Sequence, residues 1–144
     1  MNESKKILRA EREFSVRFSE VDSMGIVWHG SYPLYFEDAR EEFGRIYHLE
    51  YMHMFEMGFY APLVDLQFHF KKPLKYGDTG RIVITLQNTD AAKILFNYEI
   101  YNKETGELVA TGSSTQVFLD TEYNLVWTMP EFFIEWKRMN GLEG

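Results

Sequence analysis

The sequence predicts an α+β fold in which an antiparallel sheet of about five strands wraps around one long central helix. Two patterns lead to this prediction. Apolar residues recur with the 3.6-residue period of a helix over residues 32–47, and with the two-residue period of a strand over most of residues 64–119. Because the apolar face of the helix and the apolar face of the sheet must both be buried, each should cover the other.

The elements expected before the sheet's main run are a short strand and the long helix. Apolar and polar residues alternate over residues 14–18, which predicts a strand, and a loop at residues 22–30 follows it. The helix begins after Ser31, a good N-cap residue, with Pro33 in the first turn, where the missing N–H of proline costs no hydrogen bond. Its apolar stripe consists of Tyr32, Tyr35, Phe36, Ala39, Phe43, Ile46 and Tyr47.

Four further strands are expected to follow as a meander, in which each strand pairs with the next. They cover residues 64–70, 81–87, 94–100 and 109–119. Short connections with turn-forming residues separate them, and such connections favour antiparallel neighbours. A short closing helix is expected at residues 130–139. A helix wrapped by a sheet of this kind is the hot-dog arrangement.

Length, charge and hydropathy limit the classes of protein that the chain can represent. Its 144 residues fit a single hot-dog domain over residues 1–144. The 22 acidic and 15 basic side chains give a net charge of −7, so neither nucleic acid nor a membrane is an expected partner. No apolar stretch approaches the ~18 residues of a membrane span. The basic residues Lys5 and Lys6 are not followed by the apolar core of a signal peptide, so a cytoplasmic location is expected.

Metal and cofactor chemistry is not expected from the sequence. The chain has no cysteine, which excludes disulfides, thiolate nucleophiles and cysteine-ligated metals. His48 and His53 are five residues apart and would not share one face of a helix. The serines in residues 112–114 lack the strand–turn–helix context of a serine nucleophile. We therefore predict no metal and no cofactor.

The most informative segment is the loop before the long helix. Residues 18–40 read FSEVDSMGIVWHGSYPLYFEDAR, in which Asp22 is followed three residues later by Gly25 and seven residues later by His29. At a helix N-terminus four backbone N–H groups lack intrahelical partners and the helix dipole is positive, so an oxyanion placed there is stabilised. A carboxylate beside such a site can attack a carbonyl carbon or activate water.

A second segment gathers basic residues in an otherwise acidic chain. Residues 70–78 read FKKPLKYGD, with Arg81 close behind. The basic side chains can attract the phosphates of a polyanionic ligand, or they can be the solvated lysines of a hairpin.

Together the two segments resemble the 4-hydroxybenzoyl-CoA thioesterase family, hot-dog acyl-CoA thioesterases that include the Tol–Pal-associated enzymes. The resemblance covers roughly residues 14–120, and it departs at Ser31, where the family usually has Asn. It implies hydrolysis of an acyl- or aroyl-CoA thioester to the free carboxylic acid and CoA. It also implies that Asp22 acts as nucleophile or general base and that the backbone N–H at His29 polarises the carbonyl.

The expected site therefore has two groups of residues. The catalytic residues are Asp22 and His29, and the substrate-binding residues are Gly30, Ser31, Tyr32, Lys71, Lys72, Lys75 and Arg81. A hot-dog sheet has exposed edges, so a homodimer or homotetramer is expected, and the family resemblance implies active sites at the dimer interface.

Several alternatives remain open at this stage. An acyl-ACP thioesterase would use the same residues and recognise an acidic carrier protein through the basic turn. A non-catalytic acyl-CoA-binding module would bind without turnover, and a hot-dog hydratase would need a His/Asp pair that is not evident. Glu37 can be a solvated carboxylate or a catalyst. Residues 51–60, rich in aromatic and Met side chains, can be core, subunit interface or acyl pocket.

Overall fold

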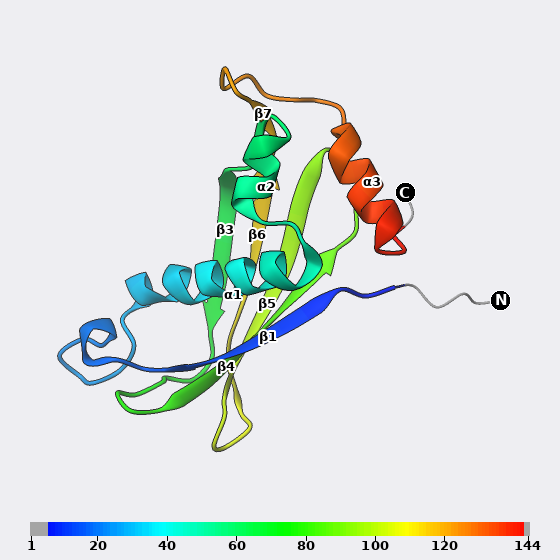
Figure 1. Ribbon diagram of the computed structural model, residues 1–144. Helices are drawn as coiled ribbons and strands as arrows, with labels where there is room; N and C mark the ends of the chain where they lie inside the picture. The colour runs from blue at the N-terminus through cyan, green and yellow to red at the C-terminus, as the bar shows by residue number, and fades with distance from the viewer. Residues whose placement is uncertain (1–5, 143–144) are drawn as a thin grey trace.

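The computed structural model describes residues 6–142 (Figure 1). The expectation about a signal peptide rests partly on residues 1–5, which lie outside the described residues. The main elements, in chain order, are β1 Arg9–Ser15, α1 Tyr32–Tyr47, α2 Tyr51–Glu56, β3 Leu63–Phe70, β4 Thr79–Gln87, β5 Lys93–Asn102, β6 Leu108–Val117 and α3 Glu131–Met139. Smaller elements are the 3₁₀ helices η1 Phe18–Glu20 and η2 His29–Ser31 and the strands β2 Phe59–Tyr60 and β7 Leu119–Asp120.

The five long strands form one antiparallel sheet in the order β1-β4-β5-β6-β3, while β2 and β7 pair separately. The predicted α+β fold and the strand positions after residue 62 are confirmed. The predicted meander is confirmed for β4, β5 and β6, but it is wrong for β3, which pairs with β6 while β1 takes the place beside β4. The connection between β3 and β4 crosses from one edge of the sheet to the strand next to the other edge. Its backbone bonds to the loop before α1 instead of closing a hairpin: Val27 N–H donates to Leu74 O and Tyr76 N–H to Gly25 O.

The first strand lies earlier in the chain than the alternation at residues 14–18 predicts. β1 pairs with β4 from Arg9 opposite Thr85 to Ser15 opposite Thr79. Its charged residues are compatible with a strand because they stay exposed, and Glu11 and Glu13 form ion pairs with Arg81 and Lys103. Phe18, expected in the strand, begins η1 and is 77% exposed.

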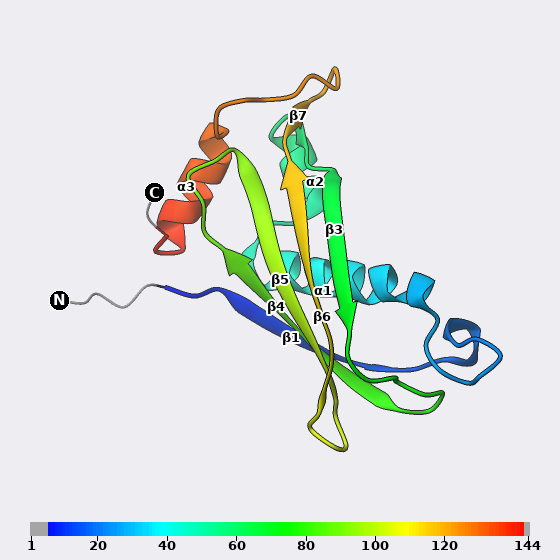
Figure 2. The ribbon, with the colours of Figure 1, turned by 180° about the vertical axis from the view of Figure 1, so that it is seen from behind.

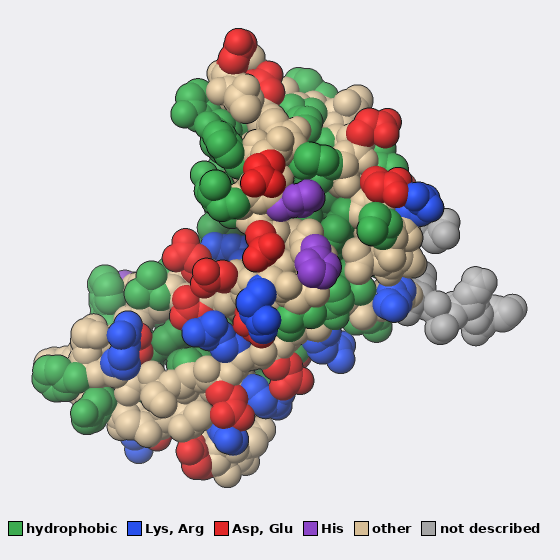
Figure 3. Space-filling model, in the orientation of Figure 1, with side chains coloured by type: hydrophobic (Ala, Val, Ile, Leu, Met, Phe, Trp, Pro, Cys, Tyr) green, Lys and Arg blue, Asp and Glu red, His purple; other side chains and the backbone are tan. Residues whose placement is uncertain are grey.

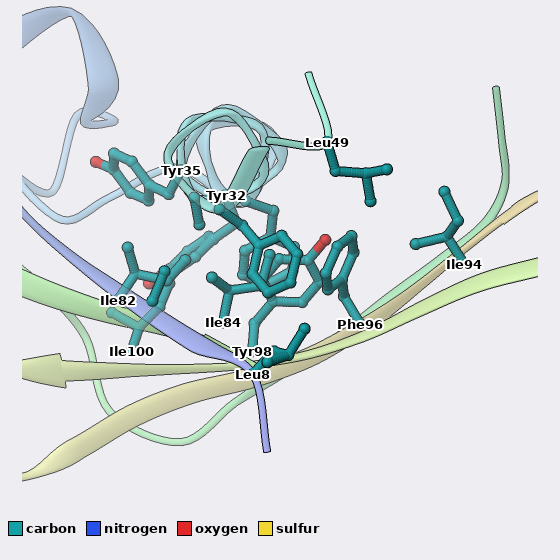
Figure 4. Packing of buried hydrophobic residues seen from close by; sticks show 14 of the residues in the cluster. Leu8, Tyr32, Tyr35, Leu49, Ile82, Ile84, Ile94, Phe96, Tyr98 and Ile100 are labelled. Carbon is teal, nitrogen blue, oxygen red and sulfur yellow. The ribbon is translucent and has the colours of Figure 1, made fainter. Parts of the chain in front are cut away.

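Helix α1 lies across one face of the sheet, and no helix formed by residues 6–142 covers the other face (Figures 1 and 2). The ring of Phe36 stacks on Tyr98 of β5 with the centroids 4.3 Å apart, and Phe43 packs edge-on against Phe96 at 4.9 Å. The strand residue Gly112 permits this close approach, since a Cβ there would lie 2.5 Å from the Phe36 ring. Figure 4 shows the resulting core, in which residues of α1 face β4 and β5.

The predicted apolar stripe of α1 is buried except at its C-terminal end, where Ile46 is 42% exposed and Tyr47 is half-buried. There α3 completes the core: the ring of Phe133 packs on Phe118, and Trp136 Nε1 donates to Tyr47 O at 2.7 Å. Helix α3 occupies the stretch where the sequence predicts a closing helix. Within residues 6–142, no helix is both long and apolar enough to cross a membrane.

Candidate active site

The loop that carries Asp22 is a small hairpin held by its own backbone. An antiparallel bridge joins Val21 to Val27, and Asp22 N–H donates to Ile26 O at 2.9 Å. One carboxylate oxygen of Asp22 accepts a hydrogen bond from Met24 N–H at 2.8 Å, an Asx turn of the kind that Asp favours. Gly25 has φ of +78°, a conformation that favours glycine and closes the turn. The local sequence thus fixes where Asp22 lies.

The two segments singled out in the sequence lie against each other. Val27 N–H bonds to Leu74 O, and Tyr76 N–H bonds to Gly25 O. An antiparallel bridge also joins Ile26 to Lys75. Between the segments lies a cavity of about 410 Å³ that opens to the surface. It is lined by Asp22, Ile26, Val27, Trp28, His29, Tyr32, Phe70, Lys71, Lys72 and Pro73.

The cavity reaches the start of α1, where backbone donors are available. Within the described part of the chain, the backbone N–H groups of His29 and Gly30 donate no hydrogen bond. The indole of Trp28 packs over Gly30 so closely that a Cβ there would lie 2.1 Å from a ring carbon. A side chain at this position would therefore require the exposed Trp28 ring to move.

Ser31 takes the N-cap position of α1, as the sequence predicts, but its side chain does not bond to a backbone N–H of the first turn. The turn η2 precedes the helix, and Ser31 is buried with its Oγ donating to Glu20 O at 3.0 Å. The serine therefore ties the start of the helix to the chain ahead of the Asp22 loop. Pro33 does lie in the first turn, as expected.

The structure brings together most of the predicted site residues. The cavity is lined by Asp22, His29, Tyr32, Lys71 and Lys72, whereas Gly30 and Ser31 lie between His29 and Tyr32 in the chain and are not among the lining residues. The Nζ atom of Lys72 is 3.0 Å from Glu107 Oε2, an exposed ion pair. Burial raises the pKa of Tyr32 above its usual value, so this ring is a neutral wall of the cavity at physiological pH.

Two of the predicted residues lie apart from the cavity. Lys75 is exposed and is not among the lining residues, although its backbone binds Asp78 within the turn. Arg81 points to the helix-free face of the sheet, 3.2 Å from Glu11 and 4.6 Å above the ring of Tyr101. Strand alternation explains this position, since the neighbouring Ile82 is buried on the helix side.

Sequence reasoning assigned no role to Trp28, Phe70 or Glu20. The two aromatic residues form apolar walls of the cavity, and a signal for them existed because Trp28 lies within residues 18–40 and Phe70 within residues 70–78, the two segments singled out in the sequence. Glu20 is buried close behind the loop, where it accepts hydrogen bonds from Arg17 and Tyr35. No sequence pattern distinguished this carboxylate from a solvated one. Within residues 6–142, no three His, Cys, Asp or Glu side chains group as metal ligands would.

The chain is similar in sequence to a family model and to several named proteins. Residues 16–137 match the model of the thioesterase-like superfamily. The Bacillus subtilis (strain 168) protein YneP, named a candidate acyl-CoA thioesterase, is 33% identical over 113 residues, which cover 78% of this chain and 81% of that protein. A chloroplast acyl-acyl carrier protein thioesterase of Arabidopsis thaliana is 28% identical over 116 residues, which cover 81% of this chain and 61% of that protein.

A solved structure extends the likeness to three dimensions. The DHNA-CoA thioesterase of Staphylococcus aureus has a TM-score of 0.81 and 27% sequence identity to this chain, covering 90% of this chain and 87% of that one. These findings confirm the family resemblance, the hot-dog fold and the enzyme class, a thioester hydrolase, that the sequence predicted. The chain belongs to the thioesterase-like superfamily.

Proposed function

We propose that this protein hydrolyses an acyl- or aroyl-CoA thioester to the free carboxylic acid and CoA. One observation carries the proposal: the cavity at the start of α1 joins the Asp22 carboxylate to a helix N-terminus with unpaired backbone N–H groups. The first group can supply or activate a nucleophile, and the second can stabilise the oxyanion that forms on the thioester carbonyl.

The remaining walls fit the two ends of such a substrate. An apolar surface for the acyl or aryl group is formed by Ile26, Val27, Trp28, Tyr32 and Phe70. Lys71 and Lys72 stand at the same cavity and can attract the phosphates of CoA, which the negative charge of the whole chain would otherwise repel. The substrate carbonyl would then lie near the backbone N–H groups of His29 and Gly30.

Asp22 can act by two routes, each of which needs no other reactant than water. As general base, it accepts a proton from water while the water oxygen bonds to the carbonyl carbon; the C–S bond then breaks, and the CoA thiolate takes up the proton. As nucleophile, a carboxylate oxygen bonds to the carbonyl carbon and expels the thiolate, and water then hydrolyses the resulting anhydride.

A single turnover in ¹⁸O water, with enzyme in excess, separates the two routes. Direct attack by water puts the label only into the acid product. An anhydride whose Asp22 carbonyl is attacked leaves the label in the protein, which mass spectrometry of the peptide containing Asp22 detects.

The function itself is tested by a screen of acyl- and aroyl-CoA thioesters with detection of the released thiol. We expect turnover of at least one class, with kcat well above the rate constant of uncatalysed hydrolysis, and much slower turnover of the corresponding oxygen esters. If the protein binds these thioesters without releasing CoA, it is a binding module and the proposal is wrong.

A carrier protein is the second candidate for the leaving group. The Arabidopsis relative is named as an acyl-acyl carrier protein thioesterase, and the exposed lysines beside the cavity suit an acidic carrier as well as CoA. The same acyl group should therefore be presented on CoA and on acyl carrier protein. A higher kcat/KM on the carrier protein would assign it as the substrate.

We also propose that the protein works as a homodimer or homotetramer in the cytoplasm. Strand β3 is an edge of the sheet, with Leu63, Val64 and Phe70 exposed, and Phe70 also lines the cavity. Antiparallel pairing with β3 of a second copy would bring the partner's Leu63 end beside this cavity. Analytical ultracentrifugation should show a dimer or larger at micromolar concentration, and Val64→Lys should weaken it and lower activity. A fully active monomer would contradict this part of the proposal.

A further inference from the structure

A buried carboxylate behind the cavity has no role in the reaction outlined above. Glu20, in η1, is only 7% exposed. Its Oε1 atom accepts hydrogen bonds from Arg17 N–H and from the hydroxyl of Tyr35, both at 2.9 Å, and its Oε2 atom accepts one from Arg17 Nε at 3.1 Å. Since a buried charge is costly unless it is fully paired, these three bonds explain why the carboxylate can lie there.

The main chain of the same residue holds the other side of the loop. Glu20 O accepts hydrogen bonds from Trp28 N–H at 2.9 Å and from Ser31 Oγ at 3.0 Å. Its side chain reaches α1 through Tyr35, whose ring lies 5.8 Å from Tyr32 in the cavity wall. One residue therefore bonds to both ends of the segment that carries Asp22 and His29, and to the first turns of the helix behind it.

We infer that Glu20 is a positioning residue, which fixes the Asp22 loop and the start of α1 relative to each other. The inference rests on the proposed hydrolysis, since it assigns Glu20 the task of keeping the Asp22 carboxylate and the backbone N–H groups of His29 and Gly30 around one carbonyl. Glu20 itself lies behind the cavity and is not among its lining residues. A displacement of reacting groups by about 1 Å can lower a rate by about 10²-fold, so such a restraint has catalytic value.

The ionisation of Glu20 agrees with this role. Burial by itself would raise the pKa of its carboxyl group, but the hydrogen bonds from Arg17 N–H, the Tyr35 hydroxyl and the Arg17 guanidinium outweigh it, and the pKa lies below its usual value. The carboxylate is therefore charged at neutral pH. Burial, followed by the bond to Glu20, raises the pKa of Tyr35, which keeps its hydroxyl proton available for donation.

The chain offers matched controls on α1 itself. Glu42 forms an ion pair with Arg45 three residues away, as Glu20 does with Arg17, but the pair lies outside the cavity lining. Tyr47 donates its hydroxyl to Arg9 O at 2.9 Å at the opposite end of the helix from Tyr35. Glu42→Gln and Tyr47→Phe thus remove the same chemical groups without touching the Asp22 loop.

The test compares Glu20→Gln and Tyr35→Phe with these two controls. We expect kcat to fall about tenfold or more in Glu20→Gln and less in Tyr35→Phe, with little change in KM or in the affinity for a non-hydrolysable thioether analogue of acyl-CoA. In the double variant the two losses should not add in full, since Glu20→Gln weakens and Tyr35→Phe removes the same hydrogen bond. The controls should keep wild-type kcat.

Amide hydrogen exchange gives a readout that does not depend on activity. The Trp28 N–H should exchange faster in Glu20→Gln and Tyr35→Phe than in wild type. Its exchange rate should be unchanged in both controls. If Glu20→Gln does not fold, Tyr35→Phe still carries both measurements, because phenylalanine keeps the stacking on Phe14.

The outcomes separate this inference from the proposed function. Wild-type protein that hydrolyses no thioester overturns the proposed function, while faster exchange confined to the Glu20 and Tyr35 variants would still support the positioning of the loop. Unchanged exchange and kcat in both variants overturn the inference, as do equal losses of kcat in the controls, which would indicate a general effect on stability.

Discussion

Two cavities among the described residues differ in size and charge, and the smaller one is the candidate active site. The cavity at the start of α1 has a volume of about 410 Å³ and joins one carboxylate, Asp22, to two lysines. The second cavity, of about 980 Å³, lies between α1, α2 and the sheet and is lined by Glu37, Asp38, Glu41, Glu50 and Glu56 with one arginine, Arg40. Figure 3 shows acidic side chains gathered over the middle of this face.

Charge and backbone orientation, and not volume, make the smaller cavity the better candidate for binding an anionic thioester. The larger cavity runs beside the middle of α1, where backbone N–H groups are engaged within the helix, and its carboxylates repel a polyanion. The smaller cavity lies at the helix N-terminus. The sequence left residues 51–60 open as core, subunit interface or acyl pocket. The larger cavity is lined by three of them, Tyr51, Met52 and Met54, and Met54 also belongs to the core.

Matched aspartate substitutions in the two cavities provide the sharpest test of this contrast. Asp22→Asn keeps the volume but removes the charge, and an amide neither attacks a thioester well nor accepts a proton from water. We expect kcat to fall by roughly 10²-fold or more, with ligand binding retained. Asp38→Asn in the larger cavity should leave kcat within about twofold of wild type. Steady-state kinetics with one acyl-CoA measure both; the reverse ranking would move the active site to the larger cavity.

A charge reversal at the lysines tests whether the smaller cavity holds the CoA phosphates. Lys71→Glu with Lys72→Glu should raise KM for acyl-CoA on the order of tenfold and change kcat much less, with a smaller effect in high salt. Thioesters that lack the nucleotide should be affected little.

The control for that variant has the same net charge. Lys93→Glu with Lys103→Glu changes two exposed lysines away from both cavities, and Lys103, like Lys72, pairs with a glutamate. An equal rise of KM in this control would mean that overall charge, and not the cavity, attracts the substrate.

Replacement of His29 tests whether its ring or its backbone acts at the helix start. If the backbone N–H stabilises the oxyanion, His29→Ala should lower kcat only a few fold, far less than Asp22→Asn. A loss as large as that of Asp22→Asn, measured under the same conditions, would assign the imidazole a direct role in proton transfer.

The smallest expected effect concerns stability in acid. Because the pKa of Glu20 is lower in the folded protein than in the unfolded chain, its contribution is complete above the ordinary glutamate pKa and is lost as pH falls through the folded pKa. The difference in free energy of unfolding between wild type and Glu20→Gln should therefore be largest near pH 7 and shrink below about pH 4. Urea titrations at several pH values measure it, and a difference independent of pH would show that the charge of Glu20 does not matter.

The sequence by itself determined the local features of this protein. The period of apolar residues and Pro33 predicted α1 at its observed bounds, and the alternating runs predicted β3 to β6. The turn at residues 22–25 is formed by the hydrogen bond from Met24 N–H to the Asp22 carboxylate and by the positive φ of Gly25, both of which lie within the turn. Local patterns succeed here because each of these features depends on neighbours a few residues away in the chain.

Tertiary structure alone decided which elements are neighbours. The period of a strand does not say which strand it pairs with, so the pairing of β3 with β6 could not be predicted, and this pairing carries residues 71–78 to the Asp22 loop. The positions of Arg81 and Glu20 could not be predicted either. Arg81 faces away from the cavity, and the burial of Glu20 depends on Tyr35, fifteen residues along the chain. These positions depend on backbone hydrogen bonds and burial between segments that are distant in the chain. The candidate active site lies where those segments come together.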